Sequence, residues 1–546
     1  MTEHSLPRRD FLAWLAAAFP AAALDWSAFP SRPRRGGKAA EYDAVIIGAG
    51  LGGLSCAAAF ARQGFRPLVI EQHDKPGGYA TAFSRPGGFL FDVSLHSTTV
   101  GERNGVYNLI PGFPDITDVE FVLHPTLFRA VYPEHTLAVA QRDPQAFVAQ
   151  LTALFPGERE GIAGLFADMR GLTADIQRLS QARGQVDMSR FPVEFPFLFQ
   201  FNGKTWGDLV DARLHDPRLK AMVSGQWGYY GLPPSKLSCF YYAMPFLSYL
   251  AQGGFYPKGR SQDISNAFVR FIESHGGTVL LNTRVERILT GQGVALGVAT
   301  ATGQEFRSRA VVSNASALDT CGPMLGDPAV LAECESAWRA YSVSLSSFQV
   351  FLGLKEDLVG KLGLTDSELF VHAGYDPELD YRGALEGTME GVGFGLALYD
   401  NIYRGYSPAG KNTLNLMTLQ GYAPWERFEV DYFGGRKAAY KKEKERLAAI
   451  LIARAEETVL PGLSGAIEVM EIGTPLTNRR YTGHPRGAVY GWDQTVNNSG
   501  ATRVGHATPV KNLYLAGAWS RMGHGYGAVI PSGVECFAEA VRGWGA

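Results

Sequence analysis

Apolar and polar positions alternate in three blocks at the start of the predicted mature domain. Val45-Ile46-Ile47 is a short apolar run typical of a buried strand, and residues 51–63 have the apolar spacing of a helix that Gly64 ends. Residues 66–70 form a second apolar run of strand character. The order strand, helix, strand predicts a βαβ unit over residues 41–71.

Glycines between the first strand and the helix indicate what this unit binds. Gly48, Gly50 and Gly53 follow the GxGxxG spacing: the first permits a tight turn, the second lets backbone approach a pyrophosphate, and the third lets helix and strand pack closely. A loop that merely tolerates glycine would show the same spacing. Here, however, Glu71 ends the second strand, where an acid is expected to bind a ribose hydroxyl. We therefore predict a dinucleotide held at the helix N-terminus.

A glycine doublet follows within a few residues of this unit. Gly77-Gly78 occurs in the pattern Glu-x-x-Asp-x-x-Gly-Gly, and it indicates a second close approach of the backbone to the cofactor. That favours FAD over NAD, with an ordinary turn as the alternative.

Two further nucleotide-type units lie in the middle and at the end of the chain. A helix is expected over residues 264–275, with strands over 279–282 and 310–315, and a last strand over 512–518 precedes a glycine-rich loop and a helix over 532–542. The sequence thus predicts an α/β fold: a discontinuous Rossmann-like, glutathione-reductase-like FAD-binding domain with an inserted α+β substrate domain. We assign residues 41–100, 254–318 and 485–546 to the FAD-binding domain and residues 101–253 and 319–484 to the substrate domain.

The N-terminus has the pattern of a twin-arginine export signal over residues 1–24. Arg8 and Arg9 precede a modest alanine-rich apolar run that Pro20 interrupts. A chance basic pair on an amphipathic helix is the alternative. Residues 25–40, rich in Pro and Gly, are expected to be a linker. This pattern predicts a periplasmic protein with possible peripheral membrane contact, and the twin-arginine route suits a protein that must fold around its cofactor before export.

Composition narrows the classes of function. The 546 residues are 46% hydrophobic and 19% charged, with a net charge of −2, so nothing indicates a nucleic-acid partner. The five cysteines are scattered and form no CxxC pair, and we expect neither a metal site nor a disulfide framework. The sequence also lacks the Gly-x-Ser-x-Gly motif of many hydrolases.

Four blocks of the sequence together resemble a known family. They are DAVIIGAGLGGLSCAAAFARQGFRPLVIEQHDKPGGYATAFSRPGGFLFDVSLHS, GGFYPKGRSQDISNAFVRFIESHGGTVLLNTRVERIL continuing to a block that ends in VVSNAS, TPLTNRRYTGHPRGAVYGWDQT and the C-terminal NLYLAGAW with GHGYGAVIPSG. The chain is similar to the FAD-dependent phytoene desaturase, carotenoid isomerase and retinol saturase superfamily over residues 41–546. The run from Arg480 to Trp492 makes it most similar to the carotenoid isomerase and retinol saturase branch.

The resemblance implies site residues. Val285 would present its backbone to the adenine, and Gly517 and the loop through Gly525 would pass along the flavin. The ADP half of FAD would be held by Gly48, Gly50, Gly53, Glu71, Gly77 and Gly78. The C-terminal block departs from the family's glycine-rich motif at Arg521 and His524, which leaves the chemistry at the flavin face open.

His96 and His524 are the candidate catalytic residues, because a histidine near a flavin is able to move a proton near neutral pH. A buried structural histidine is the alternative for each. The aromatic residues between 195 and 249 suit an apolar tunnel or a membrane-facing mouth, or else an ordinary core.

These observations predict an exported FAD enzyme that acts on carbon–carbon bonds of an apolar, polyene-like lipid by desaturation or isomerisation. Because the sequence has no second full dinucleotide unit with its own glycine loop, helix and terminal acid, NADPH-driven saturation is disfavoured. Net oxidation would pass electrons to oxygen or a quinone. One alternative is an amine-oxidase-like FAD oxidase of a small polar or aromatic substrate. Another is a non-catalytic lipid-binding protein with structural FAD.

Overall fold

The computed structural model describes residues 26, 29–31, 42–103, 106–110, 113, 115–181, 186–499, 502–542 and 544. The predicted export signal at residues 1–24 lies outside the described residues, as does most of the predicted linker. None of the described helices combines the length and apolar character needed to cross a lipid bilayer.

The first layer is a seven-stranded sheet assembled from three distant parts of the chain. Its strand order is β11-β2-β1-β14-β13-β12, and β20 pairs with β14. The strands are β1 (Tyr42–Ile47), β2 (Pro67–Ile70), β11 (Thr278–Leu280), β12 (Val285–Gly291), β13 (Val294–Thr300), β14 (Glu305–Ser313) and β20 (Leu513–Leu515). β1 runs parallel to β2 and β14, and β20 runs parallel to β14. Every position of β2 and five of the six in β1 are buried, which explains their continuous apolar runs.

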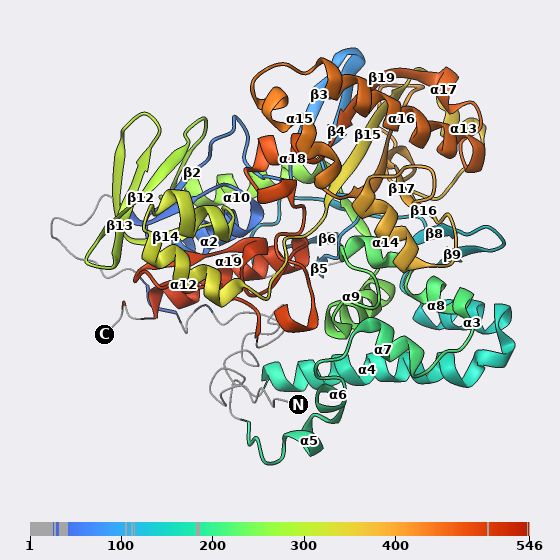
Figure 1. The fold of residues 1–546 in the computed structure, drawn as a ribbon, viewed down its shortest axis with the longest axis horizontal. Coiled ribbons are helices and arrows are strands. Elements are labelled where there is room, and N and C mark those ends of the chain that lie inside the picture. The colour runs from blue at the N-terminus through green and yellow to red at the C-terminus, as the bar shows by residue number, and fades with distance from the viewer. Residues whose placement is uncertain are drawn as a thin grey trace.

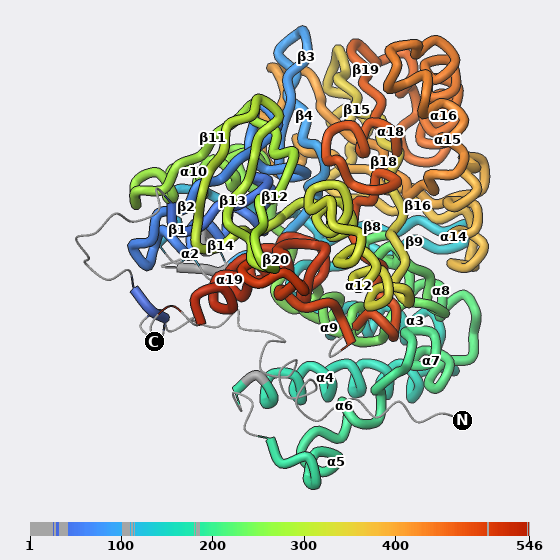
Figure 2. The backbone as a smooth tube through the Cα atoms, turned by 60° about the vertical axis from the view of Figure 1, so that its left-hand side comes forward, coloured from blue at the N-terminus to red at the C-terminus, as the bar shows by residue number. Residues whose placement is uncertain are grey.

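Three helices accompany this sheet: α2 (Leu51–Arg62), α10 (Arg260–Ser274) and α19 (Tyr526–Val541). α2 packs against both α10 and α19, and the views in Figures 1 and 2 place all three beside the sheet. Alanines 57–59 and 61 on α2 are buried, so that small side chains let the neighbouring helices approach. α19 begins at Tyr526, directly after Gly525, rather than at residue 532, because the glycine-rich loop is shorter than its composition indicates.

A second seven-stranded sheet forms the substrate domain. Its order is β19-β15-β18-β17-β16-β8-β9. The strands are β8 (Phe128–Val131), β9 (Thr136–Val139), β15 (Ser346–Leu354), β16 (Glu368–Val371), β17 (Phe394–Leu398), β18 (Asn412–Gln420) and β19 (Ile467–Gly473). β15 pairs antiparallel with β18 and β19, and all nine of its residues are buried. The helices α15 (Ala423–Phe433), α16 (Ala438–Thr458) and α18 (Pro475–Thr482) lie around the β15–β19 edge (Figure 1).

Helices of the first substrate segment form an arm at the bottom of Figure 1. They include α3 (Pro144–Leu154), α4 (Arg159–Gln181), α5 (Phe191–Glu194), α6 (Pro196–Gln200), α7 (Trp206–Asp211), α8 (Pro217–Val223) and α9 (Cys239–Gln252). α4 packs against α6 and α9. The predicted α/β architecture is thus confirmed: two sheets and a helical arm meet around a shared interior.

Candidate functional site

A cavity of about 1720 Å³ lies where the two sheets and the helical arm meet. One part of the cavity is lined by Gly48, Gly50, Glu71, Gly77 and Gly78. We call these residues, together with the other predicted FAD residues Gly53, Val285, Gly517 and Gly525, the nucleotide cradle. We call another part the aromatic chamber. It is lined by residues of the connection between β4 (Phe89–Asp92) and β5 (Gly101–Arg103), of α4, of the segment before α9, and of α9 itself. The chamber residues include His96, Ser97, Gln226, Tyr229, Tyr230, Tyr241, Met244, Phe246, Leu247 and Tyr249.

The glycine loop of the cradle leaves no room for side chains. Gly48 has φ +90°, and a Cβ on Gly53 would lie 2.2 Å from the carbonyl oxygen of Gly48. Gly50 is the N-cap of α2, and no side chain caps the first turn of this helix. The free N–H groups of that turn therefore remain available to an anion beside the loop.

The doublet Gly77-Gly78 lies directly on this loop. The N–H of Gly77 donates to the carbonyl of Ala49 at 2.7 Å, and a Cβ on Gly78 would come within 3.5 Å of the Cα of Gly50. The two glycine segments thus form one backbone surface against the cavity.

Glu71 is fixed in the cradle by backbone donors. Its Oε2 accepts the N–H of Ala49 at 2.7 Å, and its Oε1 accepts the N–H of His73 at 2.9 Å. Each carboxylate oxygen has room to accept one more hydrogen bond, and Glu71 lines the cavity. Glu71 therefore supports the glycine loop and keeps acceptor capacity for ribose hydroxyls.

Asn314 connects the three parts of the cradle. The sequence motifs used to predict individual cofactor-binding residues did not identify it. It follows β14, and its N–H donates to Ile47 at 2.9 Å. Its Nδ2 lies 2.5 Å from where a Gly50 Cβ would stand, and its Oδ1 lies 2.4 Å from the corresponding position at Gly517. The first, middle and last segments of the chain therefore touch at one side chain; its sequence signal was the block ending VVSNAS.

The other predicted cofactor residues also border the cavity. Val285 begins β12, and Gly517 and Gly525 have φ of +81° and +86°. The cradle thus offers glycine backbone, a free helix N-terminus and a fixed acid along one cavity. This set of groups fits FAD.

The two candidate histidines have different hydrogen bonding. His96 is buried and its Nε2 has no partner among the described residues. His524 Nε2 lies 3.0 Å from the carbonyl oxygen of Tyr229, which only accepts, so Nε2 carries the proton and Nδ1 accepts from Gln494 Nε2 at 3.1 Å. Burial lowers the pKa of both histidines to about 4. Both are neutral near pH 7. His96 lines the cavity, and among the described residues its Nε2 has no hydrogen-bond partner, whereas both ring nitrogens of His524 have one.

A buried carboxyl group behind the chamber wall was not predicted. Glu368, the first residue of β16, accepts hydrogen bonds from two phenols: Tyr249 donates to its Oε2 at 2.9 Å, and Tyr229 donates to its Oε1. Burial raises the pKa of Glu368 to about 7, while these two hydrogen bonds lower it. Since Tyr229 and Tyr249 line the chamber, an exchangeable proton lies one hydroxyl group away from the cavity. An acid inside an apolar strand pattern was its only sequence signal.

The aromatic residues divide between the two roles that the sequence left open. Those that line the chamber are Tyr229, Tyr230, Tyr241, Phe246 and Tyr249. Trp206 and Tyr242 stack at 4.4 Å in the core of the arm instead, and Phe199 is exposed.

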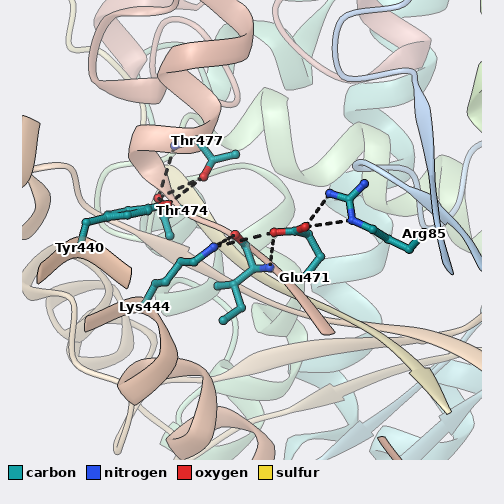
Figure 3. A network of polar contacts seen from close by, with 7 residues as sticks. Arg85, Tyr440, Lys444, Glu471, Thr474 and Thr477 are labelled. Carbon is teal, nitrogen blue, oxygen red and sulfur yellow. Dashed lines mark hydrogen bonds and ion pairs between the residues drawn. The ribbon is translucent and has the colours of Figure 1, made fainter. Parts of the chain in front are cut away.

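A polar region borders the cavity near β19 (Figure 3). Arg85 donates through Nε to Glu471 at 3.0 Å, and the Nζ of Lys444 lies 3.8 Å from the same carboxylate. Beside them, the hydroxyl of Tyr440 lies within 3.0 Å of Thr474 Oγ1 and 3.1 Å of Thr477 Oγ1.

Comparisons with known proteins agree with this site. Residues 51–536 match the model of the family described as flavin containing amine oxidoreductase. Prolycopene isomerase 1 of an Oncidium hybrid cultivar is 27% identical, over 98% of this chain and 91% of that protein. All-trans-retinol 13,14-reductase of Danio rerio is 26% identical, over 87% and 82%. Among solved structures, cyclohexylamine oxidase from Brevibacterium oxydans IH-35A has a TM-score of 0.58 at 16% identity, covering 92% of this chain and 100% of that one, a likeness of fold alone.

The predicted cofactor, fold and family are therefore confirmed. The chain belongs to the flavin containing amine oxidoreductase family as an FAD-dependent oxidoreductase, and it resembles the carotenoid isomerase and retinol saturase branch.

Proposed function

We propose that this FAD-dependent oxidoreductase acts on carbon–carbon bonds of an apolar, polyene-like lipid, by desaturation or by isomerisation. The observation that carries this proposal is the continuity of the nucleotide cradle with the aromatic chamber in one cavity. A long apolar substrate needs such a chamber beside the flavin. The relatives named prolycopene isomerase and all-trans-retinol 13,14-reductase support the same class of substrate.

The lining of the chamber favours a lipid over an amine. Among the described residues that line it, from 96 to 100, 173 to 177 and 226 to 252, there is no Asp, Glu, Lys or Arg. The carboxyl group of Glu368 stands behind two phenols instead of facing the cavity as a bare charge. A cationic amine would find aromatic faces there but no ionised partner.

Each part of the site has a role in this reaction. Bound FAD supplies the redox chemistry. The glycine loop and Glu71 orient the cofactor, and the aromatic chamber aligns the polyene and excludes water. His96 holds a neutral nitrogen at the chamber wall that is able to accept a proton. If the reaction is a net oxidation, electrons pass to oxygen or a quinone; isomerisation needs no acceptor.

The test compares two substrate classes on one preparation of the holoprotein. A poly-cis carotenoid and a more saturated carotenoid precursor are incubated with it in detergent, and the products are separated by liquid chromatography. Cyclohexylamine is tested in parallel with a hydrogen peroxide assay. Polyene isomerisation or desaturation supports the proposal. Peroxide release with the amine and an unchanged carotenoid would replace it with the amine-oxidase alternative, and bound flavin that reacts with neither class would favour the non-catalytic alternative.

Export by the twin-arginine route to the periplasm is part of the same proposal. It is supported by the sequence of residues 1–24 alone. Replacing Arg8 and Arg9 with Lys should retain the flavoprotein in the cytoplasm, as cell fractionation would show. Unchanged export of this variant would dismiss the twin-arginine route.

A further inference from the structure

Helices α15 and α18 present large apolar side chains to solvent next to the cavity. Val430 and Phe433, one turn apart on α15, are 78% and 50% exposed, and Tyr481 on α18 is 49% exposed. The guanidinium of Arg479 lies 5.3 Å from the ring of Phe433 and so joins α15 to α18. Clustered exposed apolar groups of this size mark interaction sites more often than single ones do.

Positive charges without an ion-pair partner lie close to two of these side chains. Lys437 Nζ lies 4.3 Å from the ring centroid of Tyr432, which packs on Phe433, and the guanidinium of Arg480 lies 5.5 Å from the ring centroid of Tyr481. We call Lys437, Lys441 and Arg480 the cationic rim: Lys437 is the N-cap of α16, Lys441 lies one turn further, and Arg480 precedes Tyr481. Within the described part of the chain, no carboxylate forms an ion pair with any of the three. Lys437 is partly buried, which lowers its pKa, and the charges of Arg480 and Lys441 lower it further.

Most acidic side chains near the rim have partners. Glu471 binds Arg85 and Lys444 (Figure 3). Three further pairs are Glu429 with Arg479, Asp431 with Arg436, and Glu443 with Arg446. Among the described residues Glu426 and Glu445 form no ion pair, but the rim cations and the exposed Lys442 outnumber them, so the charge left over at this surface is positive.

The same surface borders the cavity. Lys437, Lys441, Arg480 and Tyr481 are all among its lining residues, together with Tyr432 and Lys444. A molecule bound on this surface would lie beside the entrance to the interior.

We propose that the surface formed by Val430, Phe433, Tyr481 and the cationic rim docks on a bilayer rich in anionic lipids. Lysine and arginine around exposed apolar side chains are complementary to phosphate headgroups above acyl chains. The inference rests on the proposed function, because an apolar polyene dissolves in the membrane and has to leave it to reach the chamber.

A second exposed apolar pair lies on the helical arm, at the opposite end of the molecule in Figure 1. Val193 on α5 and Phe199 on α6 are 78% and 58% exposed. Arg190, the cation closest to Val193 in the sequence, is paired with Glu194 at 3.1 Å. This exposed pair supplies the matched comparison for the test.

The experiment measures flotation of the full-length holoprotein with vesicles of phosphatidylglycerol and phosphatidylcholine, or of phosphatidylcholine alone. We expect binding to the anionic vesicles, weakened by salt, and a loss of roughly tenfold or more in partitioning for K437Q/K441Q/R480Q and for V430S/F433S. The variant R339Q/K355Q/K511Q removes the same charge from exposed positions elsewhere and should bind like the wild type, as should V193S/F199S.

Several outcomes would overturn the docking surface: equal binding to both kinds of vesicle, unchanged binding of both surface variants, or loss of binding only in V193S/F199S. Flavin absorbance checks that each variant is folded. A second readout needs no charge removal: Phe433→Trp should show a blue shift of tryptophan emission on addition of anionic vesicles, and no shift would contradict insertion. Because no substrate is present, docking and the proposed activity fail or succeed separately.

Discussion

In the nucleotide cradle the cavity wall is mostly backbone, whereas in the aromatic chamber it is side chains. The cradle depends on glycines that let the backbone at Gly50, Gly77 and Gly78 come together without side chains between them. The chamber depends on phenols and phenyl rings that come from α9 and its neighbours. A backbone wall suits a ligand with fixed shape and charge, and a wall of side chains is able to change its specificity while the cofactor stays bound. Substitutions in the two regions should therefore have different consequences.

The largest effect is expected from Gly53→Ala in the cradle. The added Cβ would stand 2.2 Å from the carbonyl oxygen of Gly48, a backbone atom that cannot move without displacing the strand. We expect FAD retention to fall by roughly tenfold or more, measured as flavin absorbance per protein after gel filtration. Gly391→Ala, where a Cβ meets nothing within 4 Å, is the control. Full flavin content in the Gly53 variant would contradict a backbone-built cradle.

In the chamber, Phe246→Ala should destabilise the protein but leave FAD bound. The ring is buried, and its centroid lies 6.0 Å from that of Phe147 and 5.4 Å from that of Tyr242. Removing it costs about 3–5 kcal/mol in the free energy of unfolding, measured by denaturant titration. Loss of flavin from the folded variant would mean that the two regions are not separable.

Glu368→Gln should change how stability depends on pH. In the wild type the pKa of this carboxyl is raised to about 7, so the folded state binds the proton more tightly than the unfolded state does. The contribution of this proton to the free energy of unfolding is complete below about pH 4.5. It is lost as the pH rises through 7, and the loss is about 3 kcal/mol at most. The variant lacks this loss, so wild type and variant should diverge between pH 5 and 8. Glu273→Gln, at an exposed position, should follow the wild type; parallel curves for Glu368→Gln would exclude a buried titrating carboxyl.

The smallest effect is expected from Asn314→Ala, at the joint between the three segments. The amide lies close to Gly50 and Gly517 but leaves the backbone wall in place. We expect a loss of about 1 kcal/mol in FAD binding, roughly fivefold in affinity, measured by titrating apoprotein with FAD. A loss as large as that of Gly53→Ala would show that the side chain, and not the backbone, defines the cradle.

The comparison also explains how much could be predicted from the sequence. The cradle was predictable because glycine spacing and an apolar period reflect local geometry, and β1, α2 and β2 lie within about thirty residues of one another. The chamber was not, since Tyr229 and Glu368 are separated by 139 positions and meet only because β16 lies beside the arm. The spacing of aromatic residues along the sequence does not reveal whether a ring faces a cavity or a core. Tyr242 and Tyr249, for example, lie on one helix and have different roles. His96 and His524 looked equivalent as residue types, and only their hydrogen bonds distinguish them.

The pairing of β20 with β14 has a consequence for biogenesis. Gly517 and β20 are synthesised about two hundred residues after β14, so the pocket for the flavin closes only once that stretch of chain has been made. A nascent chain would expose its unfinished central sheet until then. Removing β20 and the residues after it should for this reason cost the cell the whole coloured protein, and not merely a strand.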